Sequence, residues 1–296
     1  MKRRYLMSAV LVALLAGCGT PVGADGNLVD DWAMLSAAKV PVPVAGTCYR
    51  KGVEVRTTDM RTPVAYGEKV GCTEPHVSET FYVGAITASL ADASEPPKGE
   101  ALGEAFTTCS TQAKEFLGDD WHNGLLDLMV MAPTATQWRG GARYLRCDLA
   151  EIKSDLDIVV ERAMSLKDGL RGDRPVARGC GKMVLIGEDW HDLQAVPCSA
   201  PHDAEYAGTF HTTTREFPDT LDKGRNAVGN GCFTIVAKHT GTTEAQLDRV
   251  KDFWMGWWLG DDEAWAYGDR IARCYVLVES SKPITKSLKG NGIAKL

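Results

Sequence analysis

The sequence predicts an α+β fold made of two tandem, disulfide-stapled repeats, each a small, mostly antiparallel sheet with one packed helix. Three observations predict it. The 296 residues are 44% hydrophobic and 24% charged, which is ordinary for a globular chain and enough for two modest domains. One set of motifs occurs twice along the chain. Apart from Cys18, the cysteines fall into two groups of four, one group with each set of motifs.

The N-terminus is typical of a bacterial lipoprotein signal. A basic start, Met1–Arg4, precedes an apolar run to Leu15 that is shorter than the roughly 20 residues a bilayer span needs. The run ends in Leu-Ala-Gly-Cys18, which resembles a lipobox and implies lipid attachment to Cys18. We therefore expect a signal peptide over residues 1–17, a lipid-tethered spacer over 18–45, and a mature protein anchored to the extracytoplasmic face of the cell membrane.

The charge of the mature chain limits its partners. Residues 1–17 contain three of the 33 basic residues and none of the 39 acidic ones, so the mature net charge is 30 − 39 = −9. This acidic balance argues against nucleic acid and against anionic lipid headgroups. The only membrane contact that we expect is the lipid on Cys18.

The repeat is defined by two motifs. Cys-x-x-Pro-His-x-x-Glu occurs at Cys72–Glu79 and again at Cys198–Glu205, 198 − 72 = 126 positions later. Trp-x-x-Gly-x-Arg-x-x-Arg-Cys occurs at Trp138–Cys147 and again at Trp265–Cys274, 265 − 138 = 127 positions later. We interpret the chain as a tandem duplication with these boundaries: repeat 1 over 46–152, a linker over 153–177, repeat 2 over 178–279, and a basic tail over 280–296 that we expect to fray.

Each repeat is expected to run strand-strand-strand-helix-strand-strand. Aromatic and β-branched residues favour strands, and apolar residues at helical spacing favour the helix. Four of the five strands in each repeat have expected bounds, which are 48–55, 79–90, 125–132 and 142–152 in repeat 1, and 182–186, 205–213, 253–259 and 270–278 in repeat 2. The expected helices are 100–117 and 221–238.

Eight cysteines in an exported chain indicate four disulfides. The duplication requires the same pairing in both repeats, which leaves three possibilities per repeat. We favour bridges that staple the helix to the sheet, because Cys109 lies on the apolar helical face and Cys147 lies at a strand. The favoured pairs are Cys48–Cys72, Cys109–Cys147, Cys180–Cys198 and Cys232–Cys274.

The Pro-His-x-x-Glu residues, His76 with Glu79 and His202 with Glu205, are the first candidates for chemistry. The favoured interpretation is structural, in which they satisfy buried backbone groups at a disulfide-bound turn. A catalytic pair and a ligand contact are the alternatives. Cys-x-x-x-His is also half of a zinc site, but each repeat lacks a second matching pair of ligands. We therefore expect no metal, no cofactor and no catalytic residue, and the sequence contains no nucleophile or phosphate-loop signature.

The Trp-x-x-Gly-x-Arg motif has a structural interpretation, with the arginine stacked on the indole. We also hypothesise that Arg143 and Arg270 pair with the carboxylates of Glu79 and Glu205. The acidic pairs at 119–120 and 261–262 are interpreted as solvated turn residues rather than as a weak calcium site.

A difference between the copies indicates a binding surface. Asp127, Met129 and Met131 of repeat 1 correspond to Trp254, Gly256 and Trp258 of repeat 2. Two indoles beside a glycine form a platform for a partner or a sugar. The alternative, which we weigh equally, is that Trp254 and Trp258 bury the interface between the two domains.

The combined pattern, Cys-x-x-Pro-His-x-x-Glu followed by a distant Trp-x-x-Gly-x-Arg-x-x-x-Cys, resembles the septum formation domain family. The resemblance covers about 46–152 and 178–278, and extends to Ser165-Leu-Lys and Ser287-Leu-Lys, a segment that trails such domains. It implies an envelope lipoprotein linked to division-septum formation in actinobacteria, and brings no reaction with it. We expect a non-catalytic scaffold that binds envelope or division proteins or cell-wall polymer. The alternative is a wall-modifying or metal-dependent hydrolase that uses the Pro-His-x-x-Glu residues.

Overall fold

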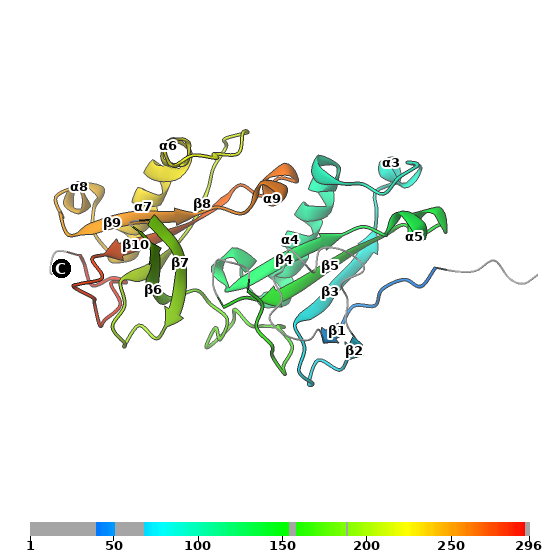
Figure 1. The fold of residues 1–296 in the computed structure, drawn as a ribbon, viewed down its shortest axis with the longest axis horizontal. Helices are drawn as coiled ribbons and strands as arrows, with labels where there is room; N and C mark the ends of the chain where they lie inside the picture. The colour runs from blue at the N-terminus through cyan, green and yellow to red at the C-terminus, as the bar shows by residue number, and fades with distance from the viewer. Residues whose placement is uncertain (1–39, 51–67, 154–157, 188, 294–296) are drawn as a thin grey trace, which may run out of the picture. The chain divides into compact units, whose positions relative to one another are not determined.

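A computed structural model describes residues 40–50, 68–153, 158–187 and 189–293. Repeat 1 forms a five-stranded sheet in the order β2-β1-β3-β5-β4, in which every neighbouring pair is antiparallel (Figure 1). Its strands are β1 (Thr47–Arg50), β2 (Glu68–Val70), β3 (Ser78–Ala85), β4 (Leu126–Met131) and β5 (Tyr144–Glu151).

Repeat 2 forms a second antiparallel sheet with the corresponding order, β7-β6-β8-β10-β9. Its strands are β6 (Cys180–Ile186), β7 (Asp189–Val196), β8 (Ala204–His211), β9 (Phe253–Trp258) and β10 (Ile271–Val278). The α+β class and the two similar units agree with the sequence prediction. Two strands end earlier than predicted, because their partner strands begin there: Ala85 of β3 faces Tyr144, and His211 of β8 faces Ile271.

One main helix packs on each sheet. In repeat 1 the 3₁₀ turn η2 (Gly99–Leu102) leads into α4 (Gly103–Leu117), which ends at Gly118 with a φ of 92°. In repeat 2 the helical segment begins with α6 (Leu221–Gly224), passes through the π-helical turn η4 (Arg225–Gly229), and continues as α7 (Asn230–Thr240) to Gly241. Glycine suits both ends, since a left-handed residue closes a helix at low steric cost.

Several short helices complete the units. They were not expected from periodicity, because a single helical turn carries too few residues to show a period. They are α3 (Ala88–Ala91), η3 (Trp121–Asn123) and α5 (Ala135–Arg139) in repeat 1, and α8 (Glu244–Leu247) and α9 (Asp262–Ala266) in repeat 2. Acidic residues at the expected turns cap two of them: Asp120 caps η3 and Asp261 caps α9.

All four expected disulfides are present. Cys48–Cys72 and Cys180–Cys198 each fasten the first strand of a repeat to the turn before the Pro-His-x-x-Glu motif. Cys109–Cys147 joins α4 to β5, and Cys232–Cys274 joins α7 to β10. The second pair of bridges therefore staples helix to sheet in both repeats, as the sequence indicated.

The segments that follow each sheet are packed rather than free. Leu166, Leu170 and Val176, within the expected linker, are buried in the core of repeat 1. Leu288 and Ile293, in the expected tail, are buried in the core of repeat 2. The prediction that the tail frays is therefore wrong for the part described, because its apolar side chains complete the second core.

Candidate functional site

The Pro-His-x-x-Glu motif of repeat 1 lies at the start of β3, where it holds the trailing segment. His76 exchanges two backbone hydrogen bonds with Arg162, at 2.8 and 2.9 Å. One Glu79 carboxylate oxygen accepts a hydrogen bond from the Ser165 hydroxyl at 2.7 Å, and the other accepts one from the Leu166 backbone N–H at 2.8 Å. The carboxylate therefore anchors a chain segment 86 residues downstream.

Repeat 2 repeats this arrangement. His202 exchanges backbone hydrogen bonds with Ile284, and Glu205 accepts from the Ser287 hydroxyl at 2.5 Å and from the Leu288 N–H at 2.8 Å. A third donor, His239 Nε2, lies 2.8 Å from Glu205. Burial alone would raise the pKa of Glu205, but these hydrogen bonds outweigh it and hold the pKa below its ordinary value.

The two motif histidines have the same environment. His76 and His202 are fully buried, and each Nδ1 lies 2.7 to 2.8 Å from a backbone carbonyl oxygen two residues earlier. A carbonyl only accepts, so each Nδ1 carries the proton and donates it. Nε2 of each ring has no hydrogen-bond partner in the described part of the chain. In repeat 2 it lies 3.8 Å from a Glu205 oxygen.

These clusters are poorly suited to metal binding or acid–base chemistry. Each also contains a cysteine, Cys48 or Cys180, whose sulfur lies within 4.8 Å of the histidine and glutamate atoms. A disulfide sulfur is not a thiolate, and the thiolate is the form that ligates metals. The carboxylates already accept strong hydrogen bonds, and every member of both clusters is buried. The geometry thus matches the structural interpretation of the motif.

The Trp-x-x-Gly-x-Arg motif fastens the loop after the third strand of each repeat. The Arg143 guanidinium lies 3.8 Å from the Trp138 ring centre, and that of Arg270 lies 4.2 Å from the Trp265 ring centre. The Trp138 indole N–H donates to the Ala93 carbonyl at 2.7 Å. Arg143 Nε donates to the nearby Ala91 carbonyl at 2.6 Å. The stacked arginine predicted from the sequence is therefore present in both copies.

The hypothesis that these arginines pair with the motif carboxylates is wrong. Arg143 donates to the Trp138, Ala142 and Ala91 carbonyls. Arg270 donates to backbone carbonyls of its own turn. Glu79 and Glu205 instead bind the trailing segments, which the hypothesis did not consider.

A family model described as "Septum formation" matches residues 45–274, a range that includes both motif pairs. The chain belongs to the septum formation family. Neither the curated proteins nor the solved structures gave a match. In the part of the chain that is described, no helix combines the length and the apolar character that crossing a bilayer requires. Cys18 and the rest of the expected signal peptide lie outside the described residues.

The tryptophans proposed as a platform in this septum formation protein have different environments. Trp254 is the second residue of the edge strand β9, and its side chain is 50% exposed. Trp258, at the other end of β9, packs against a buried cluster that contains Leu193, Tyr275 and Leu277. Gly256 lies between them and faces Tyr275 of β10. The two indoles are therefore not equivalent, and Trp254 is the one exposed at the surface.

Part of the corresponding face of repeat 1 is covered. Met129 and Met131 are buried with Val77, Ala150 and Val159, and Asp127 is also buried. Val159 belongs to the segment that follows the first sheet, so this segment covers the part of the face around Met129. The exposed indole of Trp254 therefore has a buried carboxylate, Asp127, as its counterpart in repeat 1.

The two repeats are joined by a charge cluster that the sequence analysis missed, in which His122 and Asp269 are buried and Asp120 is partly exposed. His122 of η3 lies with Nδ1 2.6 Å from Asp120 and with Nε2 3.2 Å from both oxygens of Asp269. Carboxylates only accept, so the ring donates from both nitrogens and is an imidazolium. Burial alone would lower the pKa of His122, but the two carboxylates outweigh it and raise the pKa.

Neighbouring contacts extend this junction. The Tyr267 ring lies 5.3 Å from that of Phe106, inside the core of repeat 1. The Tyr206 hydroxyl donates to Asn123 Oδ1 at 2.8 Å. The sequence signal that could have indicated this junction was a difference between the two repeats. Asp269 and Tyr267 of repeat 2 occupy the positions of Ala142 and Gly140 in repeat 1. The repeated residues build each unit, and the unrepeated ones join the units.

Proposed function

We propose that this septum formation protein is a non-catalytic, lipid-anchored scaffold on the extracytoplasmic membrane face, which binds a protein or cell-wall polymer during septum formation. The observation that carries the proposal is that the histidine and the glutamate of both Pro-His-x-x-Glu motifs are buried and that both carboxylates hold the chain's own trailing segments. The residues best suited to acid–base chemistry thus serve the fold. Family membership supports the septal role, and the lipobox at Cys18 supports the anchor.

The surface around Trp254 is the candidate contact for that partner. The side chain is half exposed on an edge strand, and the sheet behind it is cross-linked to α7 by Cys232–Cys274. A rigid aromatic side chain supplies a large contact area at a low cost in conformational entropy. Trp258 packs underneath the same face and supports it, so substitution there would disturb the fold as well as binding.

A wall-modifying hydrolase that uses His202 and Glu205 is the second candidate. The observation in its favour is the buried Nε2 lone pair of His202, 3.8 Å from the carboxylate. A substrate bond would have to reach that atom, and both side chains are 3% exposed or less. A general base has to lie within hydrogen-bonding reach of the proton it removes. The burial of this pair therefore favours the scaffold.

In-cell crosslinking of the tethered protein tests the proposal. We expect division or wall-synthesis proteins, or wall polymer, to be captured by the wild type and lost with Trp254→Ala. The matched control is Leu221→Ala, since Leu221 is another strongly exposed apolar side chain, on α6. Equal capture by Trp254→Ala and wild type would refute this surface as the contact.

A further inference from the structure

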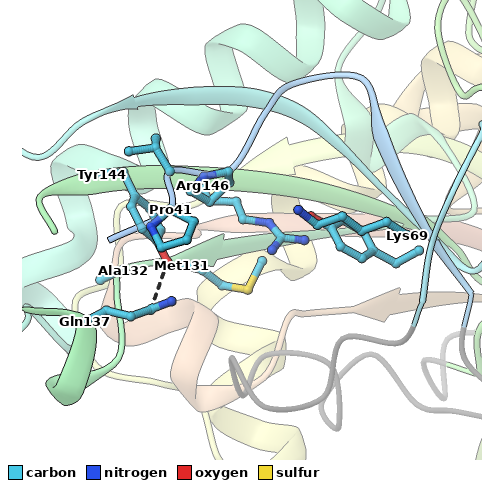
Figure 2. Close-up of a pocket in the computed structure, with 10 residues that line it drawn as sticks. Pro41, Lys69, Met131, Ala132, Gln137, Tyr144 and Arg146 are labelled. Atoms are coloured by element: carbon cyan, nitrogen blue, oxygen red, sulfur yellow. Dashed lines mark hydrogen bonds between the residues drawn. The ribbon is translucent and has the colours of Figure 1, made fainter. Parts of the chain in front are cut away.

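A hollow of about 310 Å³ opens on repeat 1, on the sheet face opposite α4. It is visible in Figure 2, where Tyr144 and Gln137 lie at one end, Lys69 at the other, and Arg146 between them. Side chains alternate along a strand, so Tyr144 and Arg146 point away from the core residues Leu145 and Cys147. The lining residues come from three parts of the chain. Tyr49 and Lys69 lie on β1 and β2, and the segment Pro41–Pro43 precedes them. The others lie on or next to β4, α5 and β5, and are Met131, Ala132, Gln137, Tyr144 and Arg146.

The hollow combines aromatic and cationic groups. The Arg146 guanidinium forms two hydrogen bonds with Asp148, at 2.8 and 2.5 Å, and lies 4.4 Å from the Tyr49 ring centre. The Tyr144 hydroxyl donates to Gln137 Oε1 at 3.0 Å, shown as the dashed line in Figure 2. Lys69 on β2 is exposed at the rim. Arg146 and Tyr49 are 7% and 3% exposed, so they form the floor of the hollow, where a ring can contact the arginine while a carboxylate lies beside the lysine.

The duplication shows what covers this surface in the other repeat. Five lining positions of the hollow recur at a constant offset of 127, as in 273 − 146. Met131, Ala132, Gln137, Tyr144 and Arg146 correspond to Trp258, Leu259, Ala264, Ile271 and Arg273.

In repeat 2 this surface receives a turn of protein. Arg273 lies 5.6 Å from the ring centre of Trp121 in η3, and Ala264 is buried in the core of repeat 1. The acidic residue before the ring, Asp120, contributes to the charge cluster at the junction. The same face of the duplicated domain therefore docks an aromatic-acidic turn in the second copy.

Repeat 1 has no such turn on this face among the described residues. The segment that begins at Val40 borders it, and a Cβ on Gly140 would lie only 2.7 Å from Val40 Cγ2. Gly140 occupies the position of Tyr267, so the residue that closes the junction in repeat 2 is absent here. The first copy thus keeps the docking face and leaves the hollow open.

We propose that this hollow is a docking site for a turn of a partner protein that presents an aromatic ring beside a carboxylate. The ring lies against the Arg146–Tyr49 pair, as Trp121 lies against Arg273, and the carboxylate pairs with Lys69. A second copy of this chain fits less well, because the counterpart of Trp121 and His122 in repeat 2 is Asp248 and Arg249, which carry no ring. This inference rests on the proposed scaffold role and narrows the partner to a protein.

A defined peptide tests the proposal on the full mature chain. The probe is a cyclic peptide with the sequence of residues 119–125, the turn that fills the counterpart surface, and binding is followed by fluorescence polarisation. We expect saturable binding that weakens at least tenfold with Lys69→Glu, and equally when the peptide's tryptophan is replaced by alanine. Lys182→Glu, the same substitution at an exposed position on β6, is the matched control and should bind as wild type does.

A second variant guards against loss of fold. Ala132→Trp fills the hollow from its wall and should abolish binding, with circular dichroism and the melting temperature reported alongside. Absent binding at millimolar peptide, or binding unchanged by Lys69→Glu and Ala132→Trp, overturns the proposal. Displacement of the peptide by wall glycan but not by protein turns, or concentration-dependent self-association lost with Lys69→Glu, also overturns it. If any of these contrary results appears while partner capture in cells is still lost with Trp254→Ala, the scaffold role stands and only this site fails.

Discussion

Glu79 and Glu205 illustrate how one side chain organises a domain. Each carboxylate accepts one hydrogen bond from a serine hydroxyl and one from the backbone N–H of the following leucine. These donors are 82 to 87 residues away in sequence. Hydrogen bonds to a charged group are worth roughly 1.5 to 3 kcal/mol each, more than neutral ones. Each glutamate therefore fixes the path of the trailing segment, and with it Leu166 or Leu288 in the core.

Glu205→Gln should destabilise the protein by about 3 kcal/mol, because an amide replaces the charged acceptor and one of its oxygens becomes a donor. Urea unfolding would measure the loss. Hydrogen exchange should also accelerate at the Leu288 amide, which now donates to the carboxylate.

Glu216→Gln is the control for this substitution, because Glu216 is an exposed carboxylate on the loop before α6. The low pKa of Glu205 adds a pH signature. The stabilisation that the Glu205 carboxylate provides is present above pH 4.5, the ordinary pKa of a glutamate, and is lost as pH falls through its lowered pKa. Glu205→Gln should therefore lose this pH dependence, and Glu216→Gln should keep it. Unchanged exchange at Leu288 would contradict the anchoring role.

At this scale the sequence predicted the role of the motif but not its partners. The structural interpretation of His76 and His202 follows from their position beside a disulfide-bound turn. The pairing of Glu79 with Ser165 could not be read from local spacing, because it joins segments far apart in sequence. The serine-leucine-lysine segments did recur in both copies, and that recurrence was the available signal.

At the scale of elements, the order strand-strand-strand-helix-strand-strand was predictable because most long elements carry an apolar period, but the sequence did not locate the second strand of either repeat, β2 or β7. The symmetry of the copies left three pairings per repeat, and the position of Cys109 on the apolar helical face favoured the bridges that the structure contains. The short helices α5 and α9 were not predictable from periodicity, although Thr134 and Gln137 form a capping box that marks the start of α5. The trailing segments were misjudged because their charged residues obscured a few buried apolar ones.

The helix-to-sheet bridge of repeat 2 closes a separation of 42 residues between Cys232 and Cys274. Replacing both cysteines with alanine should lower the free energy of unfolding by about 4 kcal/mol through loop-closure entropy. Replacing Cys180 and Cys198, which are 18 residues apart, should cost less, about 3 kcal/mol. Denaturant titrations of both variants measure the difference, and a larger loss for the shorter loop would contradict it.

At the scale of the whole molecule, the junction between repeats depends on His122, Asp120 and Asp269. Asp269 is buried, and Arg273 adds a further positive charge near it. Removing one partner of a buried charge pair typically costs 3 to 5 kcal/mol, since the other is left uncompensated. The sequence did not predict this junction, because it is built from residues that the repeats do not share.

The junction should make stability depend on pH. The pKa of folded His122 is raised above 6.5, so its stabilisation is fully present below that pH and is lost as pH rises through the folded pKa. The pKa values of Asp120 and Asp269 are lowered, so their contribution is present above 3.8 and is lost at lower pH.

Urea unfolding measured from pH 4 to pH 10 checks this behaviour. Asp269→Ala, which installs the residue that repeat 1 carries at this position, should destabilise by about 3 kcal/mol near pH 6 and by less at alkaline pH. A constant difference between wild type and variant across this range would show that His122 is not charged in the folded protein.

The most direct test of the central claim uses the double variant His76→Asn/His202→Asn. Asparagine can keep the donor that Nδ1 supplies and removes Nε2, the one ring atom available for chemistry. The measurement is in-cell capture of septal or wall partners by the folded variant beside wild type. A scaffold whose motifs serve only the fold predicts equal capture. A folded variant that loses capture or a wall-hydrolysing activity would contradict it and assign the chemistry to these histidines.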